Sequence, residues 1–360
     1  MTRLKTSAFV LFMLLCSFGG ILAFQGPALR PAEASHEIID SLKRRVAVPD
    51  RVGRILSLEP EITRIIAALG AGDKLVGVDY FMHLYDHTFK IIFPEGPSLP
   101  SLANTAAMTN IEMAMRLKPD VVFSPPEDYD VPDTLQEKMN TPVVALSSLG
   151  KFQNLLEEIE LVGDIIGAQE RAHELVRYFK GRLEDIRKTV ASFPQERRPR
   201  VYLSFWSSLI KTPSSYEPVD VAGGRNLAEG LFPAFLGSSG PTINLEKLIS
   251  WDPDIILVQG NFLPKDRIVT VADVLLDPRL SSLRAVKNKR VFYTFGYWSW
   301  WDPAEVLLET LYLARLFYPD RFPSFDLEKE GNEIFQEFYG IDKVFTELSR
   351  ALGCDEWLKE

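Results

Sequence analysis

The sequence predicts an α/β protein of two Rossmann-like lobes joined by a single long helix. Three observations support this prediction. Short apolar runs alternate with helical patterns along the chain, which is typical of parallel α/β units. A proline-free stretch at 151–190 carries apolar residues at helical spacing near the middle of the chain. The pattern at 110–123 also recurs without a gap at 244–257.

The first lobe is expected at residues 46–149. Four apolar runs predict its strands, at 55–58, 75–78, 121–123 and 143–146. Helical patterns at 61–69 and 111–117 lie between them and are followed by Gly70 and by Pro119, residues that commonly end helices. Strand and helix therefore alternate, as a parallel sheet requires.

The connecting helix is expected at 150–194 and the second lobe at 199–302. At 1.5 Å per residue the proline-free stretch would reach about 60 Å, with a bend possible near Gly163 or Gly167. Strands of the second lobe are predicted at 201–204, 255–258 and 291–293. The remaining residues, 303–352, read as amphipathic helices that pack on the lobes.

The internal repeat predicts that the two lobes are built alike. In both copies a helix ends at a Pro-Asp turn, Pro119-Asp120 or Pro253-Asp254, and leads into a buried strand. Glu112 and Glu246 occupy equivalent positions in the first turns of these helices. Carboxylates there favour the helix dipole by roughly 0.3–1 kcal/mol, which alone would explain one of them.

The N-terminus has the layout of a secretory signal peptide, expected at 1–34. Arg3 and Lys5 precede an apolar run, and a small-residue site ends at Ala34, where we expect cleavage. An uncleaved N-terminal anchor is the alternative, because the run is near the lower limit for crossing a bilayer. Lipoprotein anchoring is disfavoured, because Leu15 precedes Cys16 where lipoprotein signals carry a small residue. A soluble periplasmic protein is therefore expected.

Composition excludes several functional classes. The formal net charge is −9 and no block of Lys or Arg stands out, so nucleic acid is not an expected partner. Of the two cysteines only Cys354 lies beyond the expected signal peptide, which leaves no internal disulfide and no Cys-ligated cluster. Phosphate-cradling, dinucleotide-binding and nucleophile-elbow motifs are missing from the sequence, so no enzymatic activity is expected.

Ligands of open α/β sheets bind beyond the carboxyl ends of the strands. Aromatic residues are frequent in the segments expected there, and adjacent rings at 297–301 would not all point inward. Such rings favour flat or conjugated ligands through stacking. The predicted ligand-binding residues are Glu59, Tyr80, His83, Tyr85, Trp206, Tyr297, Trp298, Trp300 and Trp301.

A metal site is a weaker hypothesis. His83 and His87 are four residues apart, which on one helix would place both imidazoles on the same face, as metal ligation needs. A chelate whose own donors fill the coordination sphere of its metal would need no protein ligand. We therefore favour stacking over ligation, and no resident cofactor is expected.

Several stretches together resemble the iron-chelate and cobalamin class of periplasmic binding proteins. They are residues 48–63 and 69–78, the two Pro-Asp repeats, the Ala-Gly-Gly-Arg-Asn-Leu motif at 222–227 and the central helix. The resemblance covers the chain from about residue 46 to 318. It implies a stiff connection, small lobe closure and a bound iron or cobalt chelate such as a ferric siderophore, haem or a corrinoid.

The resemblance also implies a partner, the permease dimer of an ABC importer in the inner membrane, and a monomeric binding protein. One exposed acid on each lobe docks onto that permease in the resembled class, and the match falls on Glu112 and Glu246. Two alternatives remain. A carrier of free manganese, zinc or nickel would need three or four converging His, Asp or Glu ligands, and the chain has four histidines. A metal-cluster enzyme of nitrogenase-like fold would need several cysteines.

Overall fold

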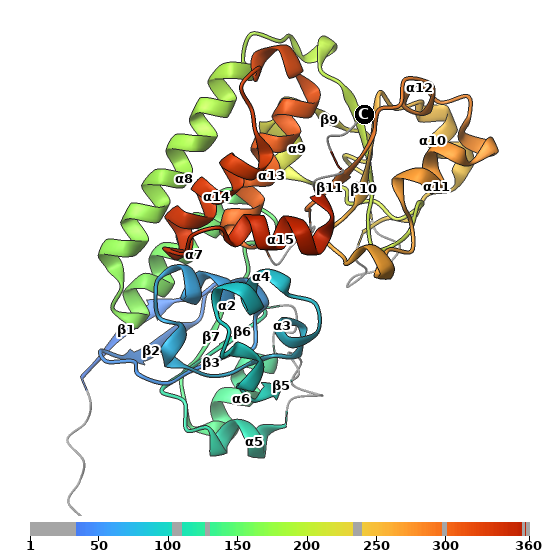
Figure 1. Ribbon diagram of the computed structural model, residues 1–360. Coiled ribbons are helices and arrows are strands. Elements are labelled where there is room, and N and C mark those ends of the chain that lie inside the picture. Colours follow the sequence, from blue (N-terminus) through green and yellow to red (C-terminus); the bar gives the residue numbers. More distant parts are fainter. Residues whose placement is uncertain are drawn as a thin grey trace, which may run out of the picture. The chain divides into compact units, whose positions relative to one another are not determined.

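A computed structural model describes residues 34–102, 110–126, 130–232, 240–296, 301–354 and 357 (Figure 1). Residues Ser35–Glu360 form one compact unit. The expected signal peptide lies outside the described residues, apart from Ala34. Within the described ranges, every helix is too short or too polar to cross a membrane.

The first sheet is parallel and has the strand order β5-β4-β3-β6-β7. Its strands are β3 (Ile55–Ser57), β4 (Leu75–Asp79), β5 (Ser101–Leu102), β6 (Val121–Ser124) and β7 (Val143–Ala145). The accompanying helices are α2 (Pro60–Ala68), α3 (Tyr80–Leu84), α4 (His87–Ile92), α5 (Ile111–Arg116) and α6 (Asp130–Met139). The four predicted strands are confirmed, and the short β5 was not foreseen.

Both faces of this sheet are apolar, because helices cover each of them. Ile55 and Phe123 belong to the core cluster that includes residues of α2 and of the central helices. Leu56 and Val122 belong to a second cluster, which includes Ala114 of α5 and residues of α6. The alternation along β3 thus separates two layers of helices.

An antiparallel hairpin, β1 (Ser35–Ile39) and β2 (Arg45–Pro49), precedes the first sheet. This hairpin was not predicted from the sequence. Asp40 holds its turn by accepting hydrogen bonds from the main chain of Leu42 and from the main chain and guanidinium of Arg44. Arg44 also donates to the carbonyl of Val143, which ties the hairpin to β7.

The long helix is shorter than expected, because two helices occupy this stretch: α7 (Phe152–Ile166) and the longer α8 (Gln169–Val190). Gly167 separates them in the left-handed conformation (φ 78°), which glycine adopts without steric cost. The chain then folds back, since the rings of Phe152 and Phe179 lie 5.5 Å apart. At 1.5 Å per residue α8 alone is about 33 Å long, so the connection is a helical hairpin and not a 60 Å rod.

The second sheet is also parallel, with the order β11-β10-β8-β9. Its strands are β8 (Arg200–Ser204), β9 (Arg225–Asn226), β10 (Ile255–Gln259) and β11 (Val291–Thr294). The helices near it are α9 (Glu217–Val221), α10 (Leu245–Trp251), α11 (Val271–Leu276) and α12 (Arg284–Lys287). All three predicted strands are confirmed, and two separate parallel sheets confirm the α/β class. The lobe boundaries stay a prediction.

Three helices occupy the region 303–352: α13 (Pro303–Phe317), α14 (Leu327–Tyr339) and α15 (Val344–Leu352). α13 differs from the amphipathic pattern that we expected, because nearly all of its residues are buried. It contacts α8, α9 and α14, whereas α15 contacts α4 and α14 contacts α2. The C-terminal helices therefore pack on elements from both halves of the chain (Figure 1).

Candidate functional site

The strand orders define one switch point in each sheet, where the chain changes the direction in which it adds strands. In the first sheet the switch lies between β3 and β6, and in the second between β8 and β10. Ligands of open α/β sheets bind outside the carboxyl ends of the strands at such points. At the first switch, Glu59 follows β3 and Ser124 ends β6. At the second switch, Trp206 follows β8 and Gln259 ends β10.

Trp206 has the most unusual backbone at these strand ends. Its φ is 53° and that of Ser207 is 52°, so two successive residues with side chains are left-handed. Such conformations cost on the order of 1–3 kcal/mol each and cluster at functional sites. The main-chain N–H of Trp206 donates to Oε1 of buried Gln259 at 2.7 Å, which joins the two strands of the switch. The backbone of Trp206 is thus fixed at this strand end, and its side chain is partly exposed.

The segment after β4 presents two further predicted aromatics. Tyr80 is 41% exposed and Tyr85 is 46% exposed, so both rings are open to a ligand. Asp79 ends the strand, and its Oδ1 accepts a hydrogen bond from the main chain of Phe81 at 2.8 Å, which caps α3. Burial raises the pKa of Asp79 to about 7, against the opposing hydrogen bonds from the main chain. A carboxyl group that titrates near neutrality therefore lies beside the exposed rings.

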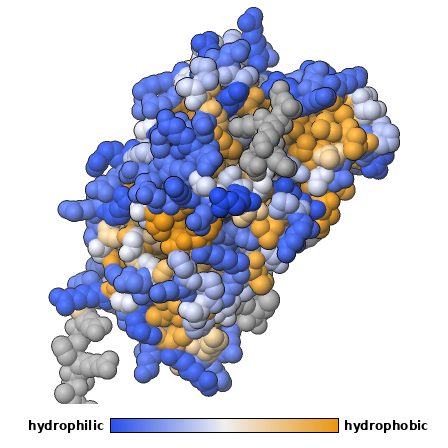
Figure 2. All heavy atoms as spheres, viewed as in Figure 1, coloured by the Kyte–Doolittle hydropathy of each residue, from blue (hydrophilic) through white to orange (hydrophobic). Residues whose placement is uncertain are grey.

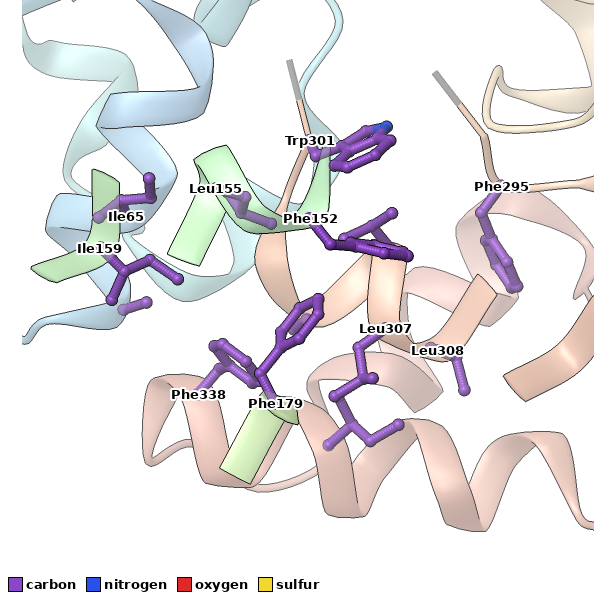
Figure 3. Packing of buried hydrophobic residues seen from close by; sticks show 14 of the residues in the cluster. Ile65, Phe152, Leu155, Ile159, Phe179, Phe295, Trp301, Leu307, Leu308 and Phe338 are labelled. Atoms are coloured by element: carbon purple, nitrogen blue, oxygen red, sulfur yellow. The ribbon is translucent and has the colours of Figure 1, made fainter. Parts of the chain in front are cut away.

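Two other predicted residues, Glu59 after β3 and Trp301 after β11, are buried. Glu59 is fully buried before α2. Trp301 is 2% exposed and its ring lies 5.1 Å from that of Phe152, within the core that Figure 3 shows. Its placement at a ligand surface is therefore wrong in this structure. Sequence position beside a strand end could not reveal that the ring turns toward α7.

Glu61 was not predicted as a site residue from the sequence. Its two carboxylate oxygens accept hydrogen bonds from the main chain and hydroxyl of Ser148, each at 2.8 Å, and from the main chain of Trp301 at 2.9 Å. Buried Glu158 lies close by, and its pKa is raised by burial and then by the negative charge of Glu61. Glu61 thus joins segments 240 residues apart in the chain.

The geometric basis of the histidine site is wrong. His83 belongs to α3 and His87 begins α4, so the two residues do not share one helical face. Asp86 separates the helices and caps α4 through a hydrogen bond to the main chain of Phe89. His83 Nε2 lies 3.2 Å from the carbonyl of Gly96. In the described part of the chain, no three His, Cys, Asp or Glu side chains gather as metal ligands would.

A buried ion pair lies next to this segment and was also missed. Arg64 Nε contacts Asp86 Oδ2 at 2.6 Å, with both side chains at most 3% exposed. Both side chains line a small cavity of about 10 Å³, together with His87, Asn261 and Glu305 among others. Burial raises the pKa of Glu305 well above its usual range, followed by the charge of Asp302. These groups connect α2 and α4 with α13 and the loop after β10.

A wider groove of about 400 Å³ lies elsewhere, between α8 and α14. It is lined mainly by charged side chains, including Arg182, which pairs with Glu330 at 2.6 Å. No strand end contributes to it. The switch points are therefore the better candidate for the ligand site.

The two acids of the repeat are exposed, as their proposed role requires. Glu112 and Glu246 lie in the first turns of α5 and α10, and the side chain of Glu112 is 87% exposed. Asn110 and Asn244 cap these helices through hydrogen bonds to the main chain of Met113 and Lys247. Of the remaining predicted site residues, Tyr297, Trp298 and Trp300 lie outside the described residues.

Comparisons with known proteins agree with this architecture. The chain is 26% identical over 338 residues to the molybdate-binding protein MolA of Haemophilus influenzae, which covers 86% of this chain and 92% of that protein. It is 23% identical over 248 residues to a cobalamin-binding protein of Halobacterium salinarum, covering 66% and 62% of the two chains.

Solved structures show the same fold. The structure of MolA bound to molybdate matches with a TM-score of 0.72 at 25% identity, covering 85% of this chain and 98% of that one. A periplasmic haem-binding protein of Pseudomonas aeruginosa matches with a TM-score of 0.56 at 21% identity, covering 74% and 93%. The model of one family, described as periplasmic binding protein, matches residues 55–296. The chain therefore belongs to the periplasmic binding protein family, as the resemblance of its sequence motifs had indicated.

Proposed function

We propose that this protein is the substrate-binding component of an ABC importer, exported to the periplasm through residues 1–34, and that it carries a metal complex to the permease. Family membership and relatives that bind molybdate and cobalamin support the transport role. Each of the two parallel sheets has a switch point, where ligands of open α/β sheets bind.

The observation that carries the ligand class is the set of partly exposed rings that follow a strand in each sheet. Tyr80 and Tyr85 are partly exposed after β4, and Trp206 is held by a strained turn after β8. Rings of this kind favour a ligand with flat, conjugated surfaces, such as a ferric catecholate, haem or a corrinoid. The ligand would then be bound whole, with its metal already coordinated by its own donors.

A compact oxyanion is the second candidate. The relative that this chain matches over 92% of its length is named for molybdate, whereas the cobalamin-binding relative is covered over 62%. Two arginines are engaged within the protein, because Arg64 pairs with Asp86 and Arg267 donates to the carbonyl of Gly260. An oxyanion would therefore depend on other cations, main-chain N–H groups and hydroxyls.

The deciding experiment is a titration of the purified mature protein with molybdate, tungstate, haemin, cyanocobalamin and a ferric catecholate, followed by calorimetry and tryptophan emission. We expect one of the three metal complexes to bind and to quench emission. Trp206→Ala should weaken that binding by roughly fivefold through lost stacking. Trp251→Ala, which removes a ring of α10, is the matched control and should leave affinity unchanged.

The outcomes separate the two ligand classes. Binding of molybdate or tungstate alone would replace the chelate proposal by the oxyanion. Unchanged affinity in Trp206→Ala with a bound chelate would refute the role of the rings.

We further propose that Glu112 and Glu246 dock the protein onto the permease. Both are exposed and equivalent in the repeat, and their helices are capped alike. The Glu112→Ala, Glu246→Ala double variant should keep ligand affinity and lose most stimulation of the permease ATPase, whereas stimulation by the unmodified protein should fall at higher salt, because salt screens the charge pairs. Glu170→Ala removes another exposed first-turn acid, in α8, and is the control.

A further inference from the structure

The repeat leaves one apolar side chain exposed at the same position in both copies. Met115 is 49% exposed and Ile249 is 37% exposed, and each follows its acid, Glu112 or Glu246, by three residues. Residues three apart lie on the same face of a helix. Each helix therefore presents a carboxylate and a large apolar side chain side by side to solvent.

Single exposed apolar residues are common on protein surfaces and need no explanation. Here the exposure is duplicated, and the neighbouring position is buried in both copies. Ala114 and Leu248, which directly precede the exposed residues, have no exposed surface. The orientation of both helices is thus the same, and the fold alone does not require Met115 or Ile249 to be apolar.

We propose that each docking surface is an acid–apolar pair, Glu112 with Met115 and Glu246 with Ile249. This proposal rests on the docking role proposed above. The occupant is a membrane permease with two equivalent surfaces, each offering a cationic side chain beside an apolar one. An interface of this kind combines an apolar contact with a charged rim, and two equivalent pairs match a partner with twofold symmetry.

The two pairs differ in how their charge is balanced. Arg116 Nη2 lies 4.0 Å from Glu112 Oε2 within α5, so the first pair carries its own counterion. Ser250 occupies the equivalent place in α10, and Glu246 has no such intrahelical partner. Figure 2 also shows hydrophobic side chains at the surface over the region of α10 and α11, where Ile249 and Leu276 are exposed. The second pair therefore contributes more to docking than the first.

The test measures ATPase stimulation of the cognate permease complex in proteoliposomes as a function of binding-protein concentration. Ile249→Gln should raise the half-maximal concentration by about fivefold and Met115→Gln by less, because part of an apolar contact is lost in each and the second pair contributes more. Arg116→Ser should lower it by about twofold, since it removes the competing counterion from Glu112. Ile39→Gln and Ile341→Gln change side chains of similar exposure, 58% and 38%, outside the repeat and should have no effect.

The outcomes separate this proposal from the docking role itself. If both acid variants weaken stimulation but Met115→Gln and Ile249→Gln do not, the docking role of the apolar residues is refuted and that of the acids is retained. If the acid variants and the glutamine variants all stimulate normally, docking at the repeat is refuted as a whole. Equal effects of Glu112→Ala and Glu246→Ala would overturn the unequal contribution of the pairs. Circular dichroism of every variant checks that α5 and α10 still fold.

Discussion

The segments α5–β6 and α10–β10 are two copies of one building block, and comparing them separates residues that build the fold from residues that are free to differ. Asp120 accepts hydrogen bonds from the main chain of Gly53 and Arg54, and Asp254 accepts one from Arg200. Both aspartates thus clamp the start of the neighbouring strand. These positions are the same because the strand must begin there.

The backbone between helix and clamp is also duplicated. Lys118 and Asp252 are equivalent, and both are left-handed, with φ of 46° and 45°. Arg54 donates to the carbonyl of Lys118, and Arg200 donates to that of Asp252. The exposed positions differ more between the two copies, because a residue that faces solvent can change type without disturbing the fold. Exposed features that recur in both copies, the acid and the apolar residue, are therefore the ones to examine for function.

The largest expected effect concerns the pH dependence of the free energy of unfolding, to which two buried carboxyl groups contribute. Asp79 at the end of β4 and Glu309 of α13 both have a pKa raised by burial to about 7. A raised acid pKa means that the folded state binds a proton which the unfolded state has already released, so stability is fully present below the unfolded pKa near 4 and is lost as pH rises through 7. At roughly 1.4 kcal/mol per pKa unit, each group accounts for several kcal/mol.

Asp79→Asn should therefore flatten the decline of unfolding free energy between pH 4 and 7 and stabilise the protein at pH 8, while asparagine still caps α3. Glu309→Gln should act in the same direction, because glutamine can still accept from the main chain of Phe295. Urea denaturation across this pH range is the measurement. If the free energy of unfolding declines between pH 4 and 7 in both variants as it does in the wild type, Asp79 and Glu309 are not the source of the decline.

The clamps provide the next largest effect. Asp120→Ala and Asp254→Ala should each lower the free energy of unfolding by about 2 kcal/mol, because a charged acceptor of main-chain hydrogen bonds is lost. Asparagine at either position keeps one acceptor and should cost less. Chemical denaturation at pH 7 measures both pairs of variants. Losses that differ by more than about 1 kcal/mol would show that the two copies are not energetically equivalent.

The helix caps should give the smallest effect. Asn110→Ala and Asn244→Ala each remove the side-chain acceptor for a main-chain N–H in the first turn, which costs about 1 kcal/mol. Serine at these positions is a good cap and should restore most of the loss. Thermal unfolding of the four variants tests the comparison. An alanine variant as stable as the wild type would show that the cap at that position does not stabilise its helix.

The strands and the repeat were predictable because their signals are local. Buried strands such as 255–258 are continuous apolar runs, and the Pro-Asp turns end both repeat helices at fixed places. The separation of α7 from α8 was less predictable. Apolar spacing continues across Gly167, so only the left-handed backbone and the contact between Phe152 and Phe179 distinguish a hairpin from a rod.

The candidate site depended more strongly on tertiary structure. The sequence by itself determined the α/β class, the order of the strands along the chain, the duplicated building block and the exposure of Glu112 and Glu246, since periodicity and capping act within a few residues. Tertiary structure decided that Trp301 is buried, that His83 and His87 lie on separate helices, and that Glu61 joins distant segments. These features arise from contacts between residues far apart in the chain. A local sequence pattern does not contain the free energies of such contacts.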